Sequence, residues 1–298
     1  MSQRFENKDG FALVAVLLFL LVVTAVITPF ILAARTDFLL ASNAHHKARQ
    51  GHSAAGLANL IARQLASLDV EQNEKIALNS QPMRSLCGDK MIEIRVQDQL
   101  GIINLNLAPV ELLRAGFAVL PQDEISAGEL ADLALAYRSP DAPAGGVDEK
   151  LLQDGLKRAS FEVVEELYEF PGIPKMAVSE LSAVFTTYGG RPAVNLDNAP
   201  KAVADSISSS GLARDPYVVT GEESRFYRVE VTIRSISDQS AGFAGNLIET
   251  EDNKSGRFIT KEKTVVPGVI SSVTDEFTAN MDCEELLGDE VANWIAAQ

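Results

Sequence analysis

The sequence predicts an α+β fold in which one long N-terminal helix lies against a small antiparallel sheet, with a large helical block inserted between strands. Three observations predict it. An apolar run that begins at Phe11 continues past Arg35 as a pattern typical of an amphipathic helix. Farther along, short segments alternate apolar and polar residues, as strands with one buried face do. A block of helical patterns separates the first of these segments from the others.

The first element is an apolar segment that is long enough to cross a membrane. Residues 11–34 are 24 positions without a charge, and a helix of that length reaches about 36 Å, against about 30 Å of hydrocarbon. A cleavable secretory signal has an apolar region of only about 7–15 residues, so we interpret this segment as an anchor that is kept. We expect Pro29 to bend the helix. Orientation stays open, because Lys8 and Arg35 place positive charge on both sides.

The helix is expected to continue to about residue 69, since Leu57, Ile61 and Leu65 recur at helical spacing. All three histidines of the chain lie on this segment, and we interpret them as a solvated helix face: His45, His46 and His52. Residues 53–298 therefore contain neither a histidine-activated nucleophile nor a histidine-ligated zinc site. Since no phosphate-binding glycine loop and no G-x-S-x-G elbow occur either, we expect no enzyme. A hydrolase that uses a carboxylate pair is the remotest alternative.

Three segments alternate apolar and polar residues and are predicted strands: residues 92–96, 227–233 and 258–266. The stretch between the last two, residues 235–257, is long and polar, so we expect an exposed loop there.

A helical block is predicted for residues 98–214, with helices near residues 127–138, 161–170 and 175–185. Two of its segments resemble each other, "NLNLAPVELL" from Asn104 and "NLDNAPKAVA" from Asn195, and both read as helix starts opened by a proline. Chance remains the alternative for this echo.

The segment "YEFPGIPKMAVSELSAVF" resembles a helix-hairpin-helix, which in its DNA-binding form offers backbone N–H groups to a phosphate. Here Pro174 has no N–H to offer and several glutamates lie nearby, so we interpret the hairpin as a packing element. The net charge of −15 also makes nucleic acid a poor partner.

Two acidic loops carry oxygen ligands of the kind that calcium prefers. The residues are Asp141, Asp148 and Glu149 in the first loop and Glu249, Glu251, Asp252 and Asn253 in the second. Neither loop has the spacing of an EF-hand, so solvated turns are the competing interpretation. The two cysteines, Cys87 and Cys283, either form a disulfide outside the cytoplasm or are two unrelated thiols.

Four motifs together carry a family resemblance: "DGFALVAVLLFLL", "QLGIINLNLAP", "ASFEVVEELYEFPGI" and "AVNLDNAP". In order and rough spacing they resemble minor pseudopilin K of bacterial type II secretion systems, the general secretion pathway protein K family, over nearly the whole length. The resemblance implies a pilin-like fold with a large inserted all-α domain that contains the helix-hairpin-helix-like element. The implied divisions are a prepilin leader 1–10, a transmembrane and amphipathic helix 11–69, pilin-like parts 70–97 and 215–298, and the helical insert 98–214.

The resemblance also implies how the N-terminus is processed. Prepilin peptidase would cut between Gly10 and Phe11, Phe11 would become the N-methylated first residue, and the apolar stretch would be kept. Asp9 stands where the family commonly has a basic residue. Most pilin-like subunits carry a glutamate five places into the mature chain, where this sequence has Ala15. An unpaired carboxylate in a bilayer costs about 2–3 kcal/mol or more, so its absence suits a subunit with no neighbour ahead of it.

The implied function is structural: a subunit that initiates or caps a pseudopilus and so aids the export of folded proteins across the outer membrane. Its implied partners are I-type and J-type minor pseudopilins, the major pseudopilin, prepilin peptidase and the inner-membrane assembly platform, and nucleic acid is not among them. The implied location is a single-pass anchor in the inner membrane with the body in the periplasm. No cofactor is required, although calcium binding is known in the family. The alternatives are a minor pilin of a type IV pilus and a membrane-anchored helix-hairpin-helix DNA receptor.

Overall fold

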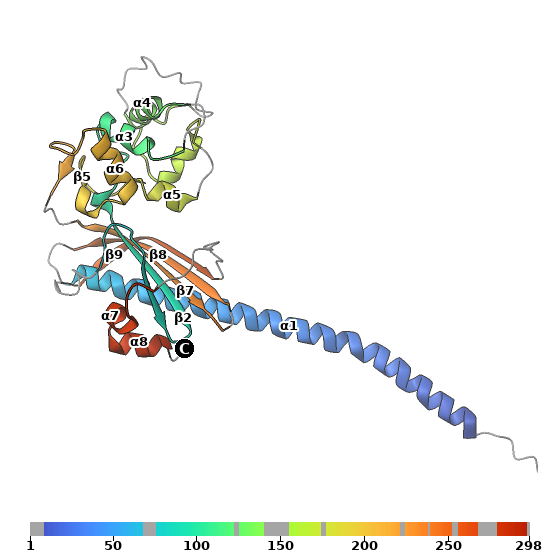
Figure 1. The fold of residues 1–298 in the computed structure, drawn as a ribbon. Helices are drawn as coiled ribbons and strands as arrows, with labels where there is room; N and C mark the ends of the chain where they lie inside the picture. Colours follow the sequence, from blue (N-terminus) through green and yellow to red (C-terminus); the bar gives the residue numbers. More distant parts are fainter. Residues whose placement is uncertain are drawn as a thin grey trace, which may run out of the picture.

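The computed structural model describes residues 9–67, 76–121, 125–139, 155–173, 177–220, 224–237, 239–251, 256–267 and 279–296, with the side chains of residues 9–12 left out. Its longest element is α1 (Asp9–Ala66), a continuous helix of 58 residues. Only the C-terminal part of α1 lies on the rest of the chain, and the N-terminal part projects away from it (Figure 1).

Five strands form one antiparallel sheet: β1 (Met83–Cys87), β2 (Lys90–Asp98), β7 (Phe226–Ser235), β8 (Ala241–Thr250) and β9 (Phe258–Pro267). Their order across the sheet is β1-β2-β7-β8-β9. The register pairs Ile94 with Val231 on the central strands, and both side chains are buried beneath α1. The predicted arrangement of a long helix on a small antiparallel sheet is confirmed.

Strand β8 corrects the expectation that residues 235–257 form an exposed loop. It pairs with β7 and β9 along ten residues and is partly buried on both faces. The stretch reads as a loop because alanine and glycine have low strand propensity. Those small residues are needed where α1 crosses the strand. A Cβ atom on Gly242 would lie 2.3 Å from the backbone carbon of Gln50, so only glycine lets the helix approach this closely.

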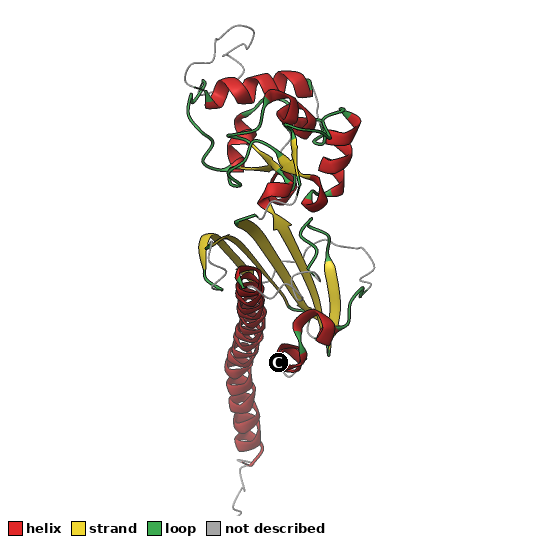
Figure 2. Cartoon of the chain, turned by 90° about the vertical axis from the view of Figure 1, so that its left-hand side faces the viewer, coloured by secondary structure: helices red, strands yellow, loops and turns green. Residues whose placement is uncertain are grey.

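Two C-terminal helices share the face of the sheet that α1 covers, α7 (Cys283–Leu287) and α8 (Asp289–Ala296) (Figure 1, Figure 2). Together with α1 and four strands they enclose one apolar core. We call α1, the sheet and these two helices the helix/sheet unit. The buried members of its core are Ala54, Ala55, Leu57, Ala58, Ile61, Met83, Cys87, Ile92, Ile94, Val96, Val229, Val231, Ile233, Ala244, Cys283, Leu287, Ala292 and Ile295.

The segment between β2 and β7, which we call the insert, has a core of its own. Its α-helices are α3 (Val110–Phe117), α4 (Ala127–Arg138), α5 (Val178–Ser182) and α6 (Lys201–Ser209). Its 3₁₀-helices are η1 (Gln99–Gly101), η3 (Val164–Glu169) and η4 (Leu196–Asn198). Both views place the insert beyond the sheet and remote from the projecting part of α1 (Figure 1, Figure 2).

The prediction that the insert is all-α is wrong. It contains two short parallel strand pairs, β3 (Ile103–Asn104) with β4 (Phe185–Thr186) and β5 (Val194–Asn195) with β6 (Val218–Val219). Two-residue strands leave no alternating pattern in a sequence, so the periodicity could not reveal them. Because β6 pairs with β5, the insert also continues past the predicted boundary at residue 214.

The two echoing segments adopt the same local structure. Each starts as a two-residue strand whose asparagine, Asn104 or Asn195, accepts a hydrogen bond from the backbone two residues ahead, at 2.8 and 3.1 Å. Each then reaches a proline at the N-cap, and a helix begins at the next residue, Val110 or Lys201. The resemblance is therefore a repeated strand-to-helix connection.

Helix α4 begins and ends at the predicted residues. The other two predicted helices are shorter than expected. Residues 161–170 contain only the 3₁₀-helix η3, and the described residues 177–184 contain only the five-residue α5. The side chains Phe161, Leu167 and Phe170 are all buried in the insert core. This packing, rather than helical propensity, sets the local backbone.

Candidate assembly helix and domain junction

The projecting part of α1 has the size and surface of a membrane-crossing helix. Residues Leu13–Ala66 form a helix that is long and apolar enough to cross a membrane, and its most apolar stretch is not buried in the protein. Large apolar side chains cover the helix surface, and Phe19 and Phe30 are 66% and 70% exposed. A water-exposed surface of this kind is costly, whereas in hydrocarbon it is favourable.

The predicted processing residues lie at the start of this helix. Gly10 and Phe11 are in the first turns of α1, and Ala15 is exposed one turn later. Cleavage before Phe11 would remove the first two residues of the helix, Asp9 and Gly10, and leave its apolar part intact. The cleavage, the methylation and the role of Ala15 remain predictions.

Hydroxyl groups satisfy backbone carbonyls inside the apolar part of α1. Thr24 Oγ1 donates to the Leu20 carbonyl at 2.8 Å, and Thr28 Oγ1 donates to the Thr24 carbonyl at 2.6 Å. These polar groups therefore add no unsatisfied donor to a bilayer. Pro29 lies one residue farther on, within the helix, and cannot donate to the carbonyl of Ala25.

The predicted calcium residues lie mostly outside the described residues. This holds for Asp141, Asp148, Glu149, Asp252 and Asn253, whereas Glu251 is described and exposed. Glu249 forms ion pairs with Arg225 at 3.2 Å and with Lys261 at 2.7 Å. Among the described residues, no three acidic, histidine or cysteine side chains come together as a metal site. Calcium binding stays a prediction that the described residues do not test.

Arg138 is the last residue of α4 and comes just before the first predicted calcium loop in the sequence. Its contacts are structural. Its guanidinium donates to the carbonyl oxygens of Leu105 and Ala108, the latter at 2.6 Å. These carbonyls belong to the turn that leads into α3, so the arginine ties α4 to the start of α3. Partial burial lowers the pKa of Arg138, although the group stays charged.

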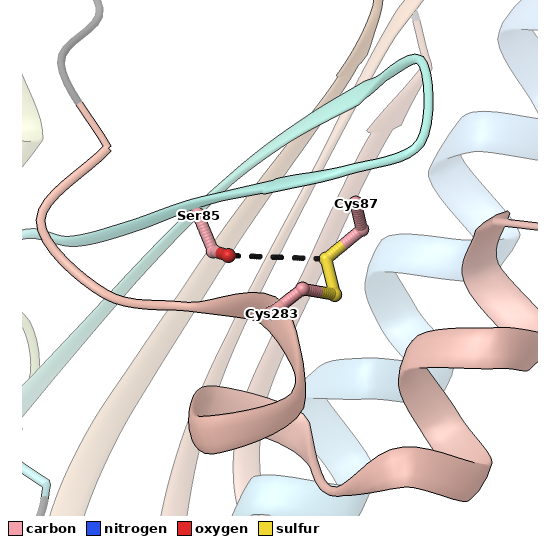
Figure 3. The surroundings of a disulfide bond; sticks show 3 residues. All are labelled: Ser85, Cys87 and Cys283. Atoms are coloured by element: carbon pink, nitrogen blue, oxygen red, sulfur yellow. Dashed lines mark hydrogen bonds between the residues drawn. A yellow bond between two sulfur atoms is a disulfide. The ribbon is translucent and has the colours of Figure 1, made fainter.

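Cys87 and Cys283 form a disulfide, which joins β1 to the start of α7 (Figure 3). Their Cα atoms are 5.4 Å apart, and the bond closes a sequence separation of 196 residues. The Ser85 hydroxyl lies 3.9 Å from Cys87 Sγ (Figure 3). The disulfide therefore fastens the C-terminal helices over the core of the helix/sheet unit, which resolves the alternatives that the sequence left open.

Glutamates cap the two described helix starts around the helix-hairpin-helix-like segment, those of η3 and α5. Glu166 accepts from the backbone N–H groups of Glu162 and Val163, at 2.6 and 3.2 Å. Glu180 accepts from the N–H of Ala177 at 3.0 Å. These two carboxylates place negative charge beside the segment, which is unfavourable for a phosphate. Pro174 lies outside the described residues.

Glu166 is held as a carboxylate by its neighbours. Partial burial works to raise its pKa, but the hydrogen bonds from the backbone of Glu162 and from Lys157 outweigh burial, so the pKa is lowered. The hydroxyl of Tyr137 also donates to Glu166 at 3.0 Å, and burial together with this carboxylate raises the pKa of Tyr137. The cluster fixes η3 against α4.

The insert joins the sheet through a buried polar node at the end of β2. Asp98 is 1% exposed and accepts from the backbone N–H of Leu100 and from Asn198 Nδ2, both at 2.7 Å. Burial raises the pKa of Asp98, against these hydrogen bonds. Gln97 Nε2 donates to the Asn198 carbonyl at 3.0 Å, and a Cβ on Gly101 would collide with the same carbonyl. Asn198 of η4 therefore ties the interior of the insert to the end of β2 and to η1.

Two small polar cavities lie beside this node. One is lined by Arg95, Gln97, Arg228 and Glu230 from the sheet and by Ser182 from the insert, and the other shares Arg228 and Ser182. Each offers about 30 Å³, whereas sites for drug-sized ligands occupy roughly 300–1,000 Å³. The space suits water rather than an organic substrate.

Comparison with known proteins identifies the fold. No family model and no curated protein matches the chain. A solved structure does: a chain of the GspK-GspI-GspJ complex from the type 2 secretion system of enterotoxigenic Escherichia coli, with a TM-score of 0.51 and 13% identity over 76% of this chain and 99% of that chain. The chain has a pilin-like fold. At this identity the likeness establishes the fold and leaves function to be argued from the residues.

Sequence reasoning missed the junction of this pilin-like chain. The sequence did not single out Asp98, Asn198 or Gly101, because strand and helix patterns do not mark contacts between segments that are distant in the sequence. The available signal was local: an aspartate two residues before the N–H that it accepts from is a common capping arrangement.

Proposed function

We propose that the chain is a minor pseudopilin that initiates or caps the pseudopilus of a type II secretion system, as a structural subunit without catalytic activity. The observation that carries this proposal is the placement of the insert. It lies at the end of the molecule remote from the apolar part of α1 (Figure 1). In a filament of parallel membrane-derived helices, a bulky domain at that end obstructs the next subunit above it and none below.

Three further features support the proposal. The pilin-like fold is shared with a chain of a GspK-GspI-GspJ complex. The apolar part of α1 can anchor the chain in the inner membrane, with the body and its disulfide in the oxidising periplasm. Ala15 leaves no unpaired carboxylate near the N-terminus. The proposed partners are I-type and J-type minor pseudopilins, the major pseudopilin, prepilin peptidase and the assembly platform.

A minor pilin of a type IV pilus would share these features, and complementation of secretion separates the two functions. A DNA receptor is disfavoured by charge, because the chain carries a net charge of −15 and the carboxylates of Glu166 and Glu180 lie at the helix starts around the hairpin-like segment.

The test is the intact mass and N-terminal peptide of the full chain extracted from membranes of cells with and without prepilin peptidase. The proposal expects a chain that starts at methylated Phe11 only when the peptidase is active. Cells without this chain should lose secretion of folded proteins and regain it with the wild-type gene. A chain that keeps residues 1–10 in both strains would refute processing as a pseudopilin.

A further inference from the structure

The solvent face of α1 carries a stripe whose chemistry the proposed function does not use. Beyond the apolar segment, the helix has exposed or half-exposed residues at spacings of three, four or seven, so they lie on one side. We call them the outer stripe: Arg35, Phe38, Ser42, His45, Arg49, His52, Gly56 and Arg63. Its three arginines recur every 14 residues, and its two histidines are seven residues apart.

The outer stripe is turned away from the chain's own body. On the opposite side of α1, Ala54, Ala58 and Ile61 are buried against the sheet. In the stripe, His52, Gly56 and Arg63 are exposed at the same height along the helix. A Cβ atom on Gly56 would meet nothing within 4 Å. The body of this chain therefore cannot cover the stripe.

The charge of the stripe is opposite to that of the rest of the chain. Residues 11–66 contain four basic residues and one acidic residue, a net charge of +3. Since residues 1–10 are neutral overall and the chain totals −15, residues 67–298 carry −18. The one acidic residue, Asp37, lies two positions from Arg35 and so on the far side of the helix. None of the ion pairs between described residues involves Arg35, Arg49 or Arg63.

Lipid headgroups can neutralise only the first of these arginines. Arg35 follows directly on the apolar segment, whereas Arg49 and Arg63 lie 14 and 28 residues later. At 1.5 Å per residue these are about 21 and 42 Å along the helix axis. Surface potentials decay over about 8–10 Å at physiological ionic strength, so the membrane does not reach the upper arginines.

We propose that the outer stripe docks an acidic helix of a neighbouring membrane-anchored subunit, with carboxylates at intervals of 14 residues facing the arginines. This inference rests on the proposed function, because subunits anchored in one membrane bring their long helices side by side in parallel. A helix is the occupant that fits a stripe of heptad spacing, because two helices that wind around each other keep such a stripe in contact. Small residues at Ser42 and Gly56 allow close approach between the charged positions, and Phe38, 71% exposed, supplies an apolar contact.

The chain provides a matched control for this docking. Lys47 is two residues from Arg49 and, like Arg49, is exposed, but it points to the other side of α1. Arg49→Glu and Lys47→Glu therefore make the same change of charge at nearly the same height. A general electrostatic effect would treat the two variants alike, whereas docking along the stripe would not.

The experiment measures binding of the full-length chain, in detergent micelles, to the purified complex of the I-type and J-type minor pseudopilins of the same secretion system. Arg49→Glu should weaken the affinity about fivefold, and Arg49→Glu with Arg63→Glu at least tenfold, because attraction is replaced by repulsion. Lys47→Glu should change the affinity less than twofold. Raising the salt concentration should narrow the difference between Arg49→Glu and wild type. Unchanged circular dichroism would show that the variants are folded.

Each result has one meaning. Equal losses for Lys47→Glu and Arg49→Glu, or no loss for either, would overturn the docking stripe while wild-type binding upholds the proposed function. Absence of wild-type binding, together with no secretion defect in cells lacking the chain, would overturn the proposed function itself. If Arg49→Glu reduced only the phosphatidylglycerol that copurifies with the chain, the stripe would be a lipid site and the inference wrong.

Discussion

Replacing Gly242 by alanine tests whether close packing of α1 on β8 stabilises the helix/sheet unit. The added Cβ would lie 2.3 Å from the backbone carbon of Gln50 and 2.3 Å from the backbone nitrogen of Gly51. Both neighbours are backbone atoms of a long helix, so no side chain can rotate away. Overpacking of this kind typically costs about 1–3 kcal/mol, and we expect Gly242→Ala to fall at the upper end.

The assay is chemical unfolding of the full chain in detergent micelles, followed by tryptophan fluorescence. Trp294 is the only tryptophan, is 49% exposed on α8, and therefore reports on the helix/sheet unit and not on the insert. In chemical unfolding the loss of about 2–3 kcal/mol should appear as a lower free energy of unfolding, and in a thermal melt it should lower the midpoint by about 4–12 °C.

Gly56→Ala is the matched control, since it makes the same substitution on the open side of α1. It should raise stability by about 0.5–1 kcal/mol, because alanine favours the helix and its Cβ meets nothing. Wild-type stability of Gly242→Ala, or a loss in Gly56→Ala as large as that in Gly242→Ala, would refute the packing argument.

Three further outcomes follow from the described contacts. Cys283→Ser should cost up to about 5 kcal/mol in the fluorescence assay, because the disulfide closes 196 residues, and should remove any sensitivity to dithiothreitol. Glu166→Gln should destabilise the insert by about 1–2 kcal/mol in tyrosine near-ultraviolet dichroism, while the Trp294 signal stays unchanged. In a pH titration of unfolding, the stability from Glu93 and Glu166, whose pKa values are lowered in the fold, should be present above about pH 4.5 and lost below it. Asp98, whose pKa is raised, should act in the opposite direction, so Asp98→Asn should steepen the acid loss.

Patterns with a regular period could be predicted from the sequence. The long helix, strands β2, β7 and β9, and helix α4 all repeat apolar residues at intervals that one face of an element requires. Strand β8 could not be predicted, because its small residues are required by the close packing of α1, which is distant in the sequence. A strand selected for close approach of a helix loses the bulky residues that identify strands.

Contacts between distant segments were less accessible. From the sequence, Cys87 and Cys283 could form a disulfide or be two unrelated thiols. The fold decides between these alternatives, because it brings their Cα atoms to 5.4 Å. The node at Asp98 likewise depends on Asn198, 100 residues later. The outer stripe differs, since its spacing is readable from the sequence once the buried side of α1 is known.

The pairing of β2 with β7 has a consequence for how the chain folds. Asp98 and Tyr227 are partners in the sheet, yet the whole insert separates them. Closing a disordered loop of that length is slow and entropically costly. The insert has its own core, so its early collapse would shorten the disordered loop between the two strand ends and turn a distant pairing into a nearly local one. We therefore expect the insert to form first, β2 to pair with β7 next, and the C-terminal helices to dock last, when oxidation joins them to β1.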